Sequence, residues 1–516
     1  TETERRQRLL RGGLNITTTL DLAKQSAADA AVQAYVPTGD ESNVKAVLVS
    51  VEPGTGRIMA IAQNTNFGVA TESDPTATQI SLGVDAKHGG LENTDGTSGF
   101  QPGSSFKAFV LAEWYQENHS PYTSFNTSPT VFPASAWTIS CDPSKADEWR
   151  VNNADPSEGG THNVIDSTRM SINVGYARMT AQMDICNITG LAARLGVTTN
   201  DGSALTPSPS IALGSQEVTP LQMANAYATF ADSGRRKKTH FVSKVLDRNG
   251  NVIREAKNET TQGIEENVAA NVTSALTSVV EEEGGTGAKA SALNRPVAGK
   301  TGTNGVDDSI TSAWFVGYTR QISTAVMYVA GDSGNENLDA YKKPGDKTFF
   351  GSGYPLTTWV EYMQTATKGQ EVKQFDKAKP IKGKSTAPEE PAPSAKPSTT
   401  SSAKPSQSSS QAPSQTSTQP APEPSGGIGG EDDNNNGFDP DPTQAPSGGT
   451  SRPSGGATGG QTDPTGRAEP TGNGGQQGGR DRQQDNDQRN RNGNSGNSGN
   501  SGNSGDGRGN GGGRRQ

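Results

Sequence analysis

Large aromatic side chains stop well before the end of this chain. All five tryptophans lie between Trp114 and Trp359, and residues 371–516 contain no aromatic residue other than Phe375 and Phe438. A segment without large apolar side chains cannot bury enough surface to offset the conformational entropy lost on folding. We therefore expect a globular part that ends near the start of that segment, followed by a long disordered C-terminal tail.

The composition of residues 371–516 changes along the segment but stays polar. Proline, serine and lysine dominate first, then glycine, asparagine and aspartate, with four Asn-Ser-Gly repeats at 494–505 and an arginine/glycine end. Proline-rich sequence is typical of semi-rigid spacers, and glycine/serine-rich sequence of flexible ones. We expect a mobile spacer that packs nowhere on the globular part.

Charge and hydropathy exclude several classes of function. The net charge of −9 at pH 7 gives no basic surface for nucleic acid. No stretch approaches the ~18 consecutive apolar residues of a membrane span, and the start has no signal-peptide pattern. Because the chain begins at Thr1 rather than methionine, we expect a processed or cloned fragment of a longer protein.

The two cysteines, Cys141 and Cys186, have no metal-binding spacing. With only four scattered histidines, the sequence predicts neither a metal site nor a cofactor. In an exported protein two cysteines can form a disulfide. Two unpaired, buried thiols are equally compatible with the sequence.

Hydrophobic periodicity predicts an α+β fold. Strands at both ends of the globular part, with helices between them, predict an antiparallel sheet built from the early hairpin and the late strands. The expected elements are a strand in 13–21, a helix to 36, hairpins in 44–63, 241–256 and 312–332, and helices in 104–118, 166–183, 219–232, 265–283 and 356–366.

The pattern Ser-x-x-Lys occurs three times, and only Ser104–Lys107 starts a predicted helix. Ser42–Lys45 enters a strand, and Ser401–Lys404 lies in the tail. Three residues are nearly one turn of ~3.6 residues, so Lys107 lies on the face of Ser104 and can act as its base. Ser105 is rotated ~100° away and is the poorer nucleophile. Alternatively, Ser104 only caps the helix and Lys107 is a solvated charge.

Ser171-Ile172-Asn173 lies in a segment with the pattern of an amphipathic helix. A serine and an asparagine among core-type residues need buried hydrogen-bond partners, which an active site would supply. The alternative, two ordinary polar residues near a helix start, is equally compatible with the sequence.

Lys300-Thr301-Gly302-Thr303 precedes two strongly β-forming runs. A glycine in an edge strand lets another backbone approach closely, so a substrate peptide can lie alongside by strand addition. The lysine and the threonine hydroxyls can hold a carboxylate. The alternative is a surface strand with a bulge.

In this order the three motifs resemble the signature of serine β-lactamases and penicillin-binding proteins. Ile172 stands where that signature has aspartate, and this difference favours penicillin-binding proteins. The stretches "GGLNITTTLDLAKQSAADAAV", "QPGSSFKAFVLA", "SINVGYARM" and "RPVAGKTGTN" resemble the transpeptidase half of class A, bifunctional members, over about residues 10–366. The resemblance implies the serine β-lactamase/transpeptidase-like fold, an antiparallel sheet flanked by helices.

The resemblance also implies a division of the chain. Residues 1–36 correspond to a linker after a glycosyltransferase domain, 37–370 to the transpeptidase domain, and 371–516 lie outside the family. The glycosyltransferase domain and the membrane anchor are expected in the longer protein, on the extracytoplasmic side of a bacterial membrane. Because the family works outside the cytoplasm, the resemblance favours a disulfide between Cys141 and Cys186.

The implied activity is that of a D,D-transpeptidase. It cross-links peptidoglycan stem peptides, a D-Ala-D-Ala donor and an amine acceptor, through a serine acyl-enzyme, and β-lactams inhibit it covalently. Other cell-wall synthesis proteins are further candidate partners. The implied catalytic residues are Ser104, Lys107, Ser171 and Lys300, and the implied substrate-binding residues are Asn173, Thr301, Gly302 and Thr303.

Two kinds of alternative remain. A β-lactamase or a D,D-carboxypeptidase of the same superfamily would use water to resolve the acyl-enzyme. Class A β-lactamases carry a deacylating glutamate in a Glu-x-x-Leu-Asn stretch, and the segment at Glu217, Glu-Val-Thr-Pro-Leu, does not match it. A penicillin-sensing or non-catalytic binding domain would acylate without turnover, or not at all.

Overall fold

A computed structural model describes residues 1–306, 309–341, 349–381 and 383. The tail predicted over 371–516 therefore lies almost entirely outside the described residues. The helices are α1 Glu2–Arg11, α2 Leu22–Gln33, α3 Lys107–Gln116, α4 Val164–Arg169, α5 Asn173–Thr180, α6 Ile185–Arg194, α7 Pro220–Ala231, α8 Glu266–Glu281 and α9 Tyr354–Ala366. The strands are β1 Asn15–Thr18, β2 Val44–Val51, β3 Ile58–Gln63, β4 Ser124–Asn126, β5 Thr130–Phe132, β6 Trp149–Val151, β7 Thr161–Asn163, β8 Arg235–Lys237, β9 Val242–Leu246, β10 Val252–Glu255, β11 Thr260–Gln262, β12 Ala298–Val306, β13 Ser309–Tyr318 and β14 Ser323–Ala330.

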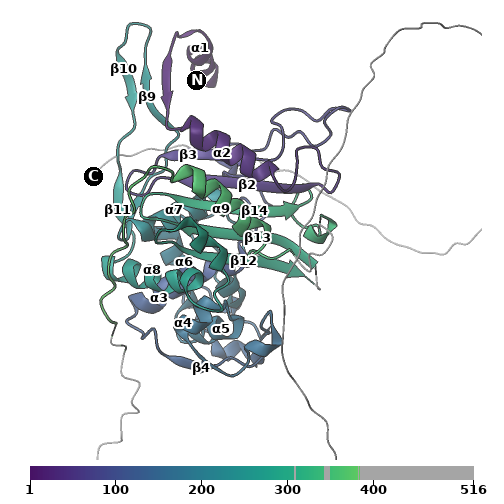
Figure 1. Ribbon diagram of the computed structural model, residues 1–516, viewed down its shortest axis with the longest axis vertical. Helices are drawn as coiled ribbons and strands as arrows, with labels where there is room; N and C mark the ends of the chain where they lie inside the picture. The colour runs from purple at the N-terminus through teal and green to yellow at the C-terminus, as the bar shows by residue number, and fades with distance from the viewer. Residues whose placement is uncertain (307–308, 342–348, 382, 384–516) are drawn as a thin grey trace, which may run out of the picture. The chain divides into compact units, whose positions relative to one another are not determined.

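A five-stranded antiparallel sheet forms the centre of the domain (Figure 1), with the strand order β12-β13-β14-β2-β3. The early hairpin β2–β3 joins the late strands through the pairing of β14 with β2. This arrangement confirms the predicted sheet. It also makes β12, which carries Lys300-Thr301-Gly302-Thr303, an edge strand.

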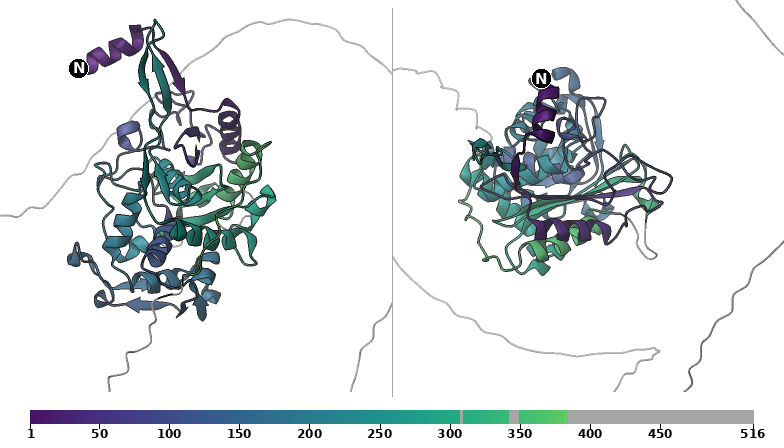
Figure 2. Two further views of the ribbon diagram at one scale, coloured as in Figure 1. Left: turned by 90° about the vertical axis from the view of Figure 1, so that its left-hand side faces the viewer. Right: turned by 90° about the horizontal axis from the view of Figure 1, so that it is seen from above.

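Alternating side chains of the sheet divide the core into two layers. Val47 and Val49 of β2 belong to the larger cluster, with buried residues of α3, α7 and α8. Leu48, between them, belongs to the second cluster, with buried residues of α2 and α9. The sheet therefore has helices on both sides (Figure 2), as the family resemblance implied.

Smaller β-structures flank these layers. Two two-stranded sheets, β4–β7 and β5–β6, lie in the same part of the chain as helices α3 to α6. A disulfide joins Cys141 to Cys186, with a Cα–Cα separation of 6.1 Å. The predicted pairing of the cysteines is thus present. At the other end, β1 pairs with the β9–β10 hairpin, which turns at Gly250 as expected from Asn-Gly (Figure 1).

The boundary expected at residue 36 is wrong as a structural boundary. Ala28 and Val32 of α2 are fully buried against the sheet and α9, in the second core cluster. The second half of the segment expected to be a linker, from Thr19 to Val36, is therefore part of the packed domain.

The boundary expected at residue 370 is also wrong, because residues 371–381 pack on the domain. Phe375 contacts Tyr318 edge-on at 5.5 Å between ring centroids. Asp376 forms an ion pair with Arg320 at 2.8 Å and accepts a hydrogen bond from Ser233 at 2.6 Å. Deleting everything after residue 370 would remove this packing.

Candidate active site

Ser104 lies in a 3-10 turn, Gly103–Phe106, that leads directly into α3. The α-helix predicted from Ser104 begins instead at Lys107, and neither the turn nor the helix has a side-chain cap. In the parts of the chain that the structure describes, the Ser104 hydroxyl has no hydrogen-bond partner, and the side chain is partly exposed. The helix-cap alternative for Ser104 is therefore wrong.

The neighbouring Ser105 is in a different position. It is fully buried, and its hydroxyl donates to the Pro102 carbonyl at 2.8 Å. Its own carbonyl accepts a hydrogen bond from the Tyr227 hydroxyl at 2.6 Å. Of the two serines, only Ser104 has a side chain available to a ligand.

Glycines allow the Ser104 turn to touch β12 backbone to backbone. A Cβ on Gly103, which has φ +54°, would lie 2.5 Å from the Thr303 carbonyl oxygen. A Cβ on Gly302 would lie 2.2 Å from the Pro102 carbonyl oxygen. Because Gly302 has no side chain, the turn that carries Ser104 can pack directly against the backbone of the edge strand.

Lys107 is fully buried beneath this turn, so the alternative of a solvated charge is wrong. Its Nζ donates to the Ser171 carbonyl at 2.6 Å and to Asn173 Oδ1 at 2.8 Å, and lies 3.3 Å from Ser171 Oγ. The same nitrogen lies 5.2 Å from the centre of the Tyr176 ring. These contacts bring the first two motifs together.

The helix predicted over 166–183 is broken at the second motif. It divides into α4 and α5, and Ser171 between them has φ +66°, a left-handed conformation that is unusual for serine. The break places the Ser171 hydroxyl 2.7 Å from Nζ of Lys300, while Lys107 contacts the same oxygen from α3. One hydroxyl thus joins all three motifs.

Burial changes the acidity of both lysines. It holds the pKa of Lys107 well below its usual value of 10.5, and the nearby charge of Lys300 lowers it further. Burial also lowers the pKa of Lys300 to about 7. At neutral pH Lys107 is therefore able to accept a proton, as a base for Ser104 must.

The other residues expected to bind substrate surround this network. Asn173 Nδ2 donates to the Asn152 carbonyl at 3.0 Å, which leaves its second N–H for a ligand. Thr303 Oγ1 accepts from the Gly351 N–H at 3.2 Å. Thr301 Oγ1 bonds to the Thr286 hydroxyl at 2.9 Å, a partner that sequence reasoning missed.

A cleft of about 640 Å³ opens over these residues. Five of the eight predicted residues line it. Lys107 and Lys300 are buried beneath it, and Gly302 contributes only its backbone, which contacts the Ser104 turn. Its lining includes Ser104, Ser171, Asn173, Thr301 and Thr303, with Asp155, Glu158, Leu213, Thr286 and Phe350. Glu158 was also missed, because it lies in an irregular segment that has no motif or periodicity.

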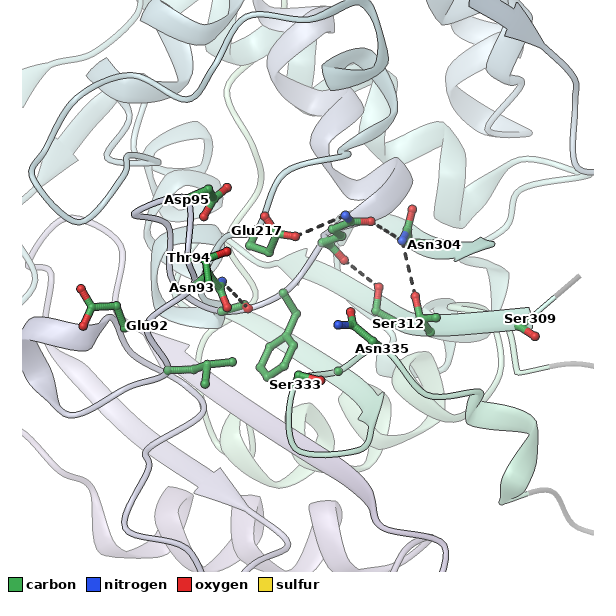
Figure 3. Close-up of a pocket in the computed structure, with 16 residues that line it drawn as sticks. Glu92, Asn93, Thr94, Asp95, Glu217, Asn304, Ser309, Ser312, Ser333 and Asn335 are labelled. Atoms are coloured by element: carbon green, nitrogen blue, oxygen red, sulfur yellow. Dashed lines mark hydrogen bonds between the residues drawn. The ribbon is translucent and has the colours of Figure 1, made fainter. Parts of the chain in front are cut away.

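A second cavity, of about 830 Å³, shares Asn304 with the cleft in its lining (Figure 3). Its wall includes Glu217, whose Oε1 accepts a hydrogen bond from Gln101 at 3.3 Å. Gln101 in turn accepts a hydrogen bond from the Asn304 amide. Glu217 thus lines this second cavity and not the cleft of Ser104.

The sequence matches the family described as "Penicillin binding protein transpeptidase domain" over residues 46–349. It is 30% identical over 406 residues to Penicillin-binding protein 1A of Mycolicibacterium smegmatis, covering 75% of this chain and 46% of that protein. It is 30% identical over 393 residues to Penicillin-binding protein 1A of Mycobacterium tuberculosis, covering 73% and 42%. The chain thus spans less than half the length of these two relatives.

Solved structures give the same picture. The structure of PonA1 from Mycobacterium tuberculosis in complex with penicillin V has a TM-score of 0.57 and 26% identity, and the match covers 74% of this chain and 94% of that one. A second structure, of the penicillin-binding protein PonA1 from Mycobacterium tuberculosis, has the same TM-score, 27% identity, and coverage of 77% and 97%.

Proposed function

The chain belongs to the penicillin-binding protein transpeptidase family, and on that premise we propose that it cross-links peptidoglycan stem peptides through an acyl-enzyme on Ser104. The observation that carries this proposal is the position of Lys107. A lysine without solvent contact, with a lowered pKa and one helical turn from an unbonded serine, is the arrangement that activates a serine nucleophile.

In the first step Lys107 accepts the proton of the Ser104 hydroxyl, and the oxygen attacks the carbonyl between the two D-alanines of a stem peptide. The backbone N–H groups of Ser104 and Thr303 stabilise the oxyanion, typically by ~3–4 kcal/mol per donor. The C–N bond then breaks, and the proton reaches the leaving D-alanine amine through Ser171, which contacts both lysines.

Substrate lies along the outer edge of β12 as an added strand. Lys300, Thr301 and Thr303 hold its terminal carboxylate, and the remaining N–H of Asn173 holds its amide. An amine from a second stem peptide then attacks the ester of Ser104, which forms the cross-link and returns the proton to the serine.

The same geometry supports covalent inhibition by β-lactams. A β-lactam presents a strained amide and a carboxylate, which the site would accept as it accepts D-Ala-D-Ala. A relative of this chain has been solved with penicillin V. We propose that penicillin acylates Ser104 and that the adduct persists.

Among the rival activities, that of a class A β-lactamase has less support. A class A β-lactamase needs a carboxylate that activates water beside the acyl-enzyme. Glu217 lines the other cavity, and Glu158, which does line the cleft, is not part of a Glu-x-x-Leu-Asn stretch. A carboxypeptidase and a penicillin sensor use the same first step and differ only in how the acyl-enzyme is resolved.

We place the domain on the extracytoplasmic side of a bacterial membrane, where its substrate lies. The disulfide fits an oxidising compartment. In the described part of the chain, no helix has the length and apolar character needed to cross a bilayer.

Intact mass measurement after incubation with a penicillin tests the proposal. One covalent adduct is expected, on the peptide that contains Ser104, with a lifetime of many minutes or more. An adduct on Ser105, or labelling that survives Ser104→Ala, would contradict the assignment of the nucleophile. Rapid hydrolysis of the drug would instead identify a β-lactamase.

A further inference from the structure

Glu158 is a carboxylate in the cleft to which no motif assigns a role. It ends a 3-10 turn, Pro156–Glu158, and lines the cleft together with Ser104 and Ser171. The turn is fixed from both ends: the Asp155 side chain accepts from the Ser157 N–H at 2.8 Å, and the Glu158 carbonyl accepts from Thr127 Oγ1 at 2.8 Å. The side chain therefore projects from a well-anchored backbone.

A single side chain ties this turn to the second motif. Asn153 Nδ2 donates to the Glu158 carbonyl at 3.2 Å, while Asn153 Oδ1 accepts from the Val174 N–H at 3.0 Å, one residue beyond Asn173. The position of Glu158 relative to Ser171 and Asn173 is thus built into the fold.

The Glu158 carboxylate acts on the lysines through space. The carboxylate interacts with the Asp155 backbone of its own turn, makes no ion pair below 4.0 Å within the described residues, and is half-buried. Its negative charge opposes the effect of burial on the pKa of both Lys107 and Lys300. Burial raises the pKa of Glu158, and the charge of Lys107 opposes only part of that rise.

We propose that Glu158 is a positioning residue that keeps one proton on the Lys107–Lys300 pair and so sets the pH range in which Ser104 is acylated. The pair shares Ser171 Oγ at 3.3 and 2.7 Å, and two buried ammonium groups at one hydroxyl would repel each other. One proton on the pair, balanced by one carboxylate, leaves Lys107 as a base and Lys300 as a cation for the substrate carboxylate. This inference rests on the proposed function.

The charged and titratable groups around Glu158 come from several elements. Lys107 faces it from α3 and Lys300 from β12, and Asp155 lies in its own turn. His162 of β7 contacts the same hydroxyl, Thr127 Oγ1, that donates to the Glu158 carbonyl; its Nδ1 lies 2.8 Å from that oxygen. Asp155 is exposed, so the two lysines dominate.

The sign of the effect is fixed by charge. Removing the anion of Glu158 lowers the pKa of both lysines further. Lys107 then becomes a free base at lower pH, so the acidic limb of the acylation profile moves to lower pH. Lys300 also loses its proton at lower pH, so the alkaline limb moves in the same direction. The whole profile shifts towards acid, by about one pH unit for a half-buried charge.

The test is the second-order rate constant of penicillin acylation, measured from about pH 5 to about pH 10 for wild type, Glu158→Gln, Glu158→Asp and the control Glu148→Gln. Glu148 is an exposed carboxylate immediately before β6 that does not line the cleft. Both limbs should move towards acid in Glu158→Gln, and stay near wild type in Glu158→Asp and Glu148→Gln.

A Glu158→Gln profile that is lower at every pH, with its limbs unmoved, would show a merely structural role and overturn the inference. Limbs that move in opposite directions, or towards alkali, would also overturn it. Failure of the proposed function has a different signature, because wild type itself would then form no adduct at Ser104. Melting temperatures of all four proteins show whether each variant is folded.

Discussion

Two helices of this domain start beside a proline and a hydroxyl residue, and only one of them uses the hydroxyl as a cap. At α7, Thr219 precedes Pro220, and its Oγ1 accepts from the Gln222 N–H at 3.1 Å. Gln222 returns the contact by accepting from the Thr219 N–H at 2.9 Å. At α3, Ser104 follows Pro102, yet its hydroxyl is left without a partner in the described structure.

The difference lies in how each backbone closes its first turn. A capping hydroxyl typically stabilises a helix start by ~1 kcal/mol, but it is then engaged. At α3 the 3-10 turn uses backbone bonds instead, from the Ser105 N–H to the Pro102 carbonyl and from the Lys107 N–H to the Ser104 carbonyl. A hydroxyl at a helix start is available for chemistry when the turn closes without it.

The largest expected effect is that of Ser104→Ala on acylation. Loss of the nucleophile should reduce penicillin labelling by at least ~10³-fold. The melting temperature should stay close to that of wild type, because the hydroxyl makes no capping bond. Intact mass and a thermal melt measure the two quantities. A large loss of stability would show that Ser104 caps α3 after all.

Lys107→Met should come next. The variant keeps the length of the side chain but removes the base, so the acylation rate should fall by ~10²–10⁴-fold. Acceptors that Lys107 now satisfies, including Asn173 Oδ1, lose a donor, and some stability is lost as well. Stopped-flow labelling of the folded variant checks the rate. An unchanged rate would exclude Lys107 as the base.

Thr219→Ala should show the opposite pattern to Ser104→Ala. Removing the cap of α7 should cost ~1 kcal/mol of unfolding free energy. Penicillin acylation should remain within about twofold of wild type, because Thr219 does not line the cleft. Denaturant unfolding and labelling rates, measured on the same preparation, test both halves. Loss of labelling in the folded variant would contradict the comparison.

The smallest effect is expected for Ser105→Ala, the matched control for the nucleophile. Its hydroxyl bonds to the Pro102 carbonyl, which also accepts from the Ser105 N–H, so no acceptor is stranded. We expect a loss of ~0.5 kcal/mol and retained acylation. If labelling disappears here and survives in Ser104→Ala, the two serines have been assigned the wrong way round.

Strong local signals made much of the fold predictable. Neighbouring residues determine the local structure at three places: the β2–β3 hairpin, the Asn-Gly turn of β9–β10 and the Thr-Pro start of α7. The break at Ser171 carries no such signal. Neither glycine nor proline marks it, and contacts from Lys107 and Lys300, remote in sequence, accompany its left-handed backbone.

Remote contacts also explain the other errors. Residues 371–381 have only one aromatic side chain, and this composition suggested disorder. In the structure Phe375 packs on Tyr318, and Asp376 forms an ion pair with Arg320. Hydrogen bonds from Thr127 and Asn153 to the Glu158 carbonyl hold this residue at the cleft, and no pattern in the sequence predicts them. The motifs identified the candidate reacting groups, whereas the surroundings of these groups could be described only from the tertiary structure.

The position of β12 at the sheet edge has a consequence for solubility. An open edge is a template for pairing with any extended chain, including a second copy of the same protein. Here the cleft narrows the approach: Gly351 comes so near to β12 that a Cβ on it would lie 2.5 Å from the Gly302 carbonyl oxygen. A second copy that paired with β12 would therefore have to enter the cleft that Thr301 and Thr303 of this strand line.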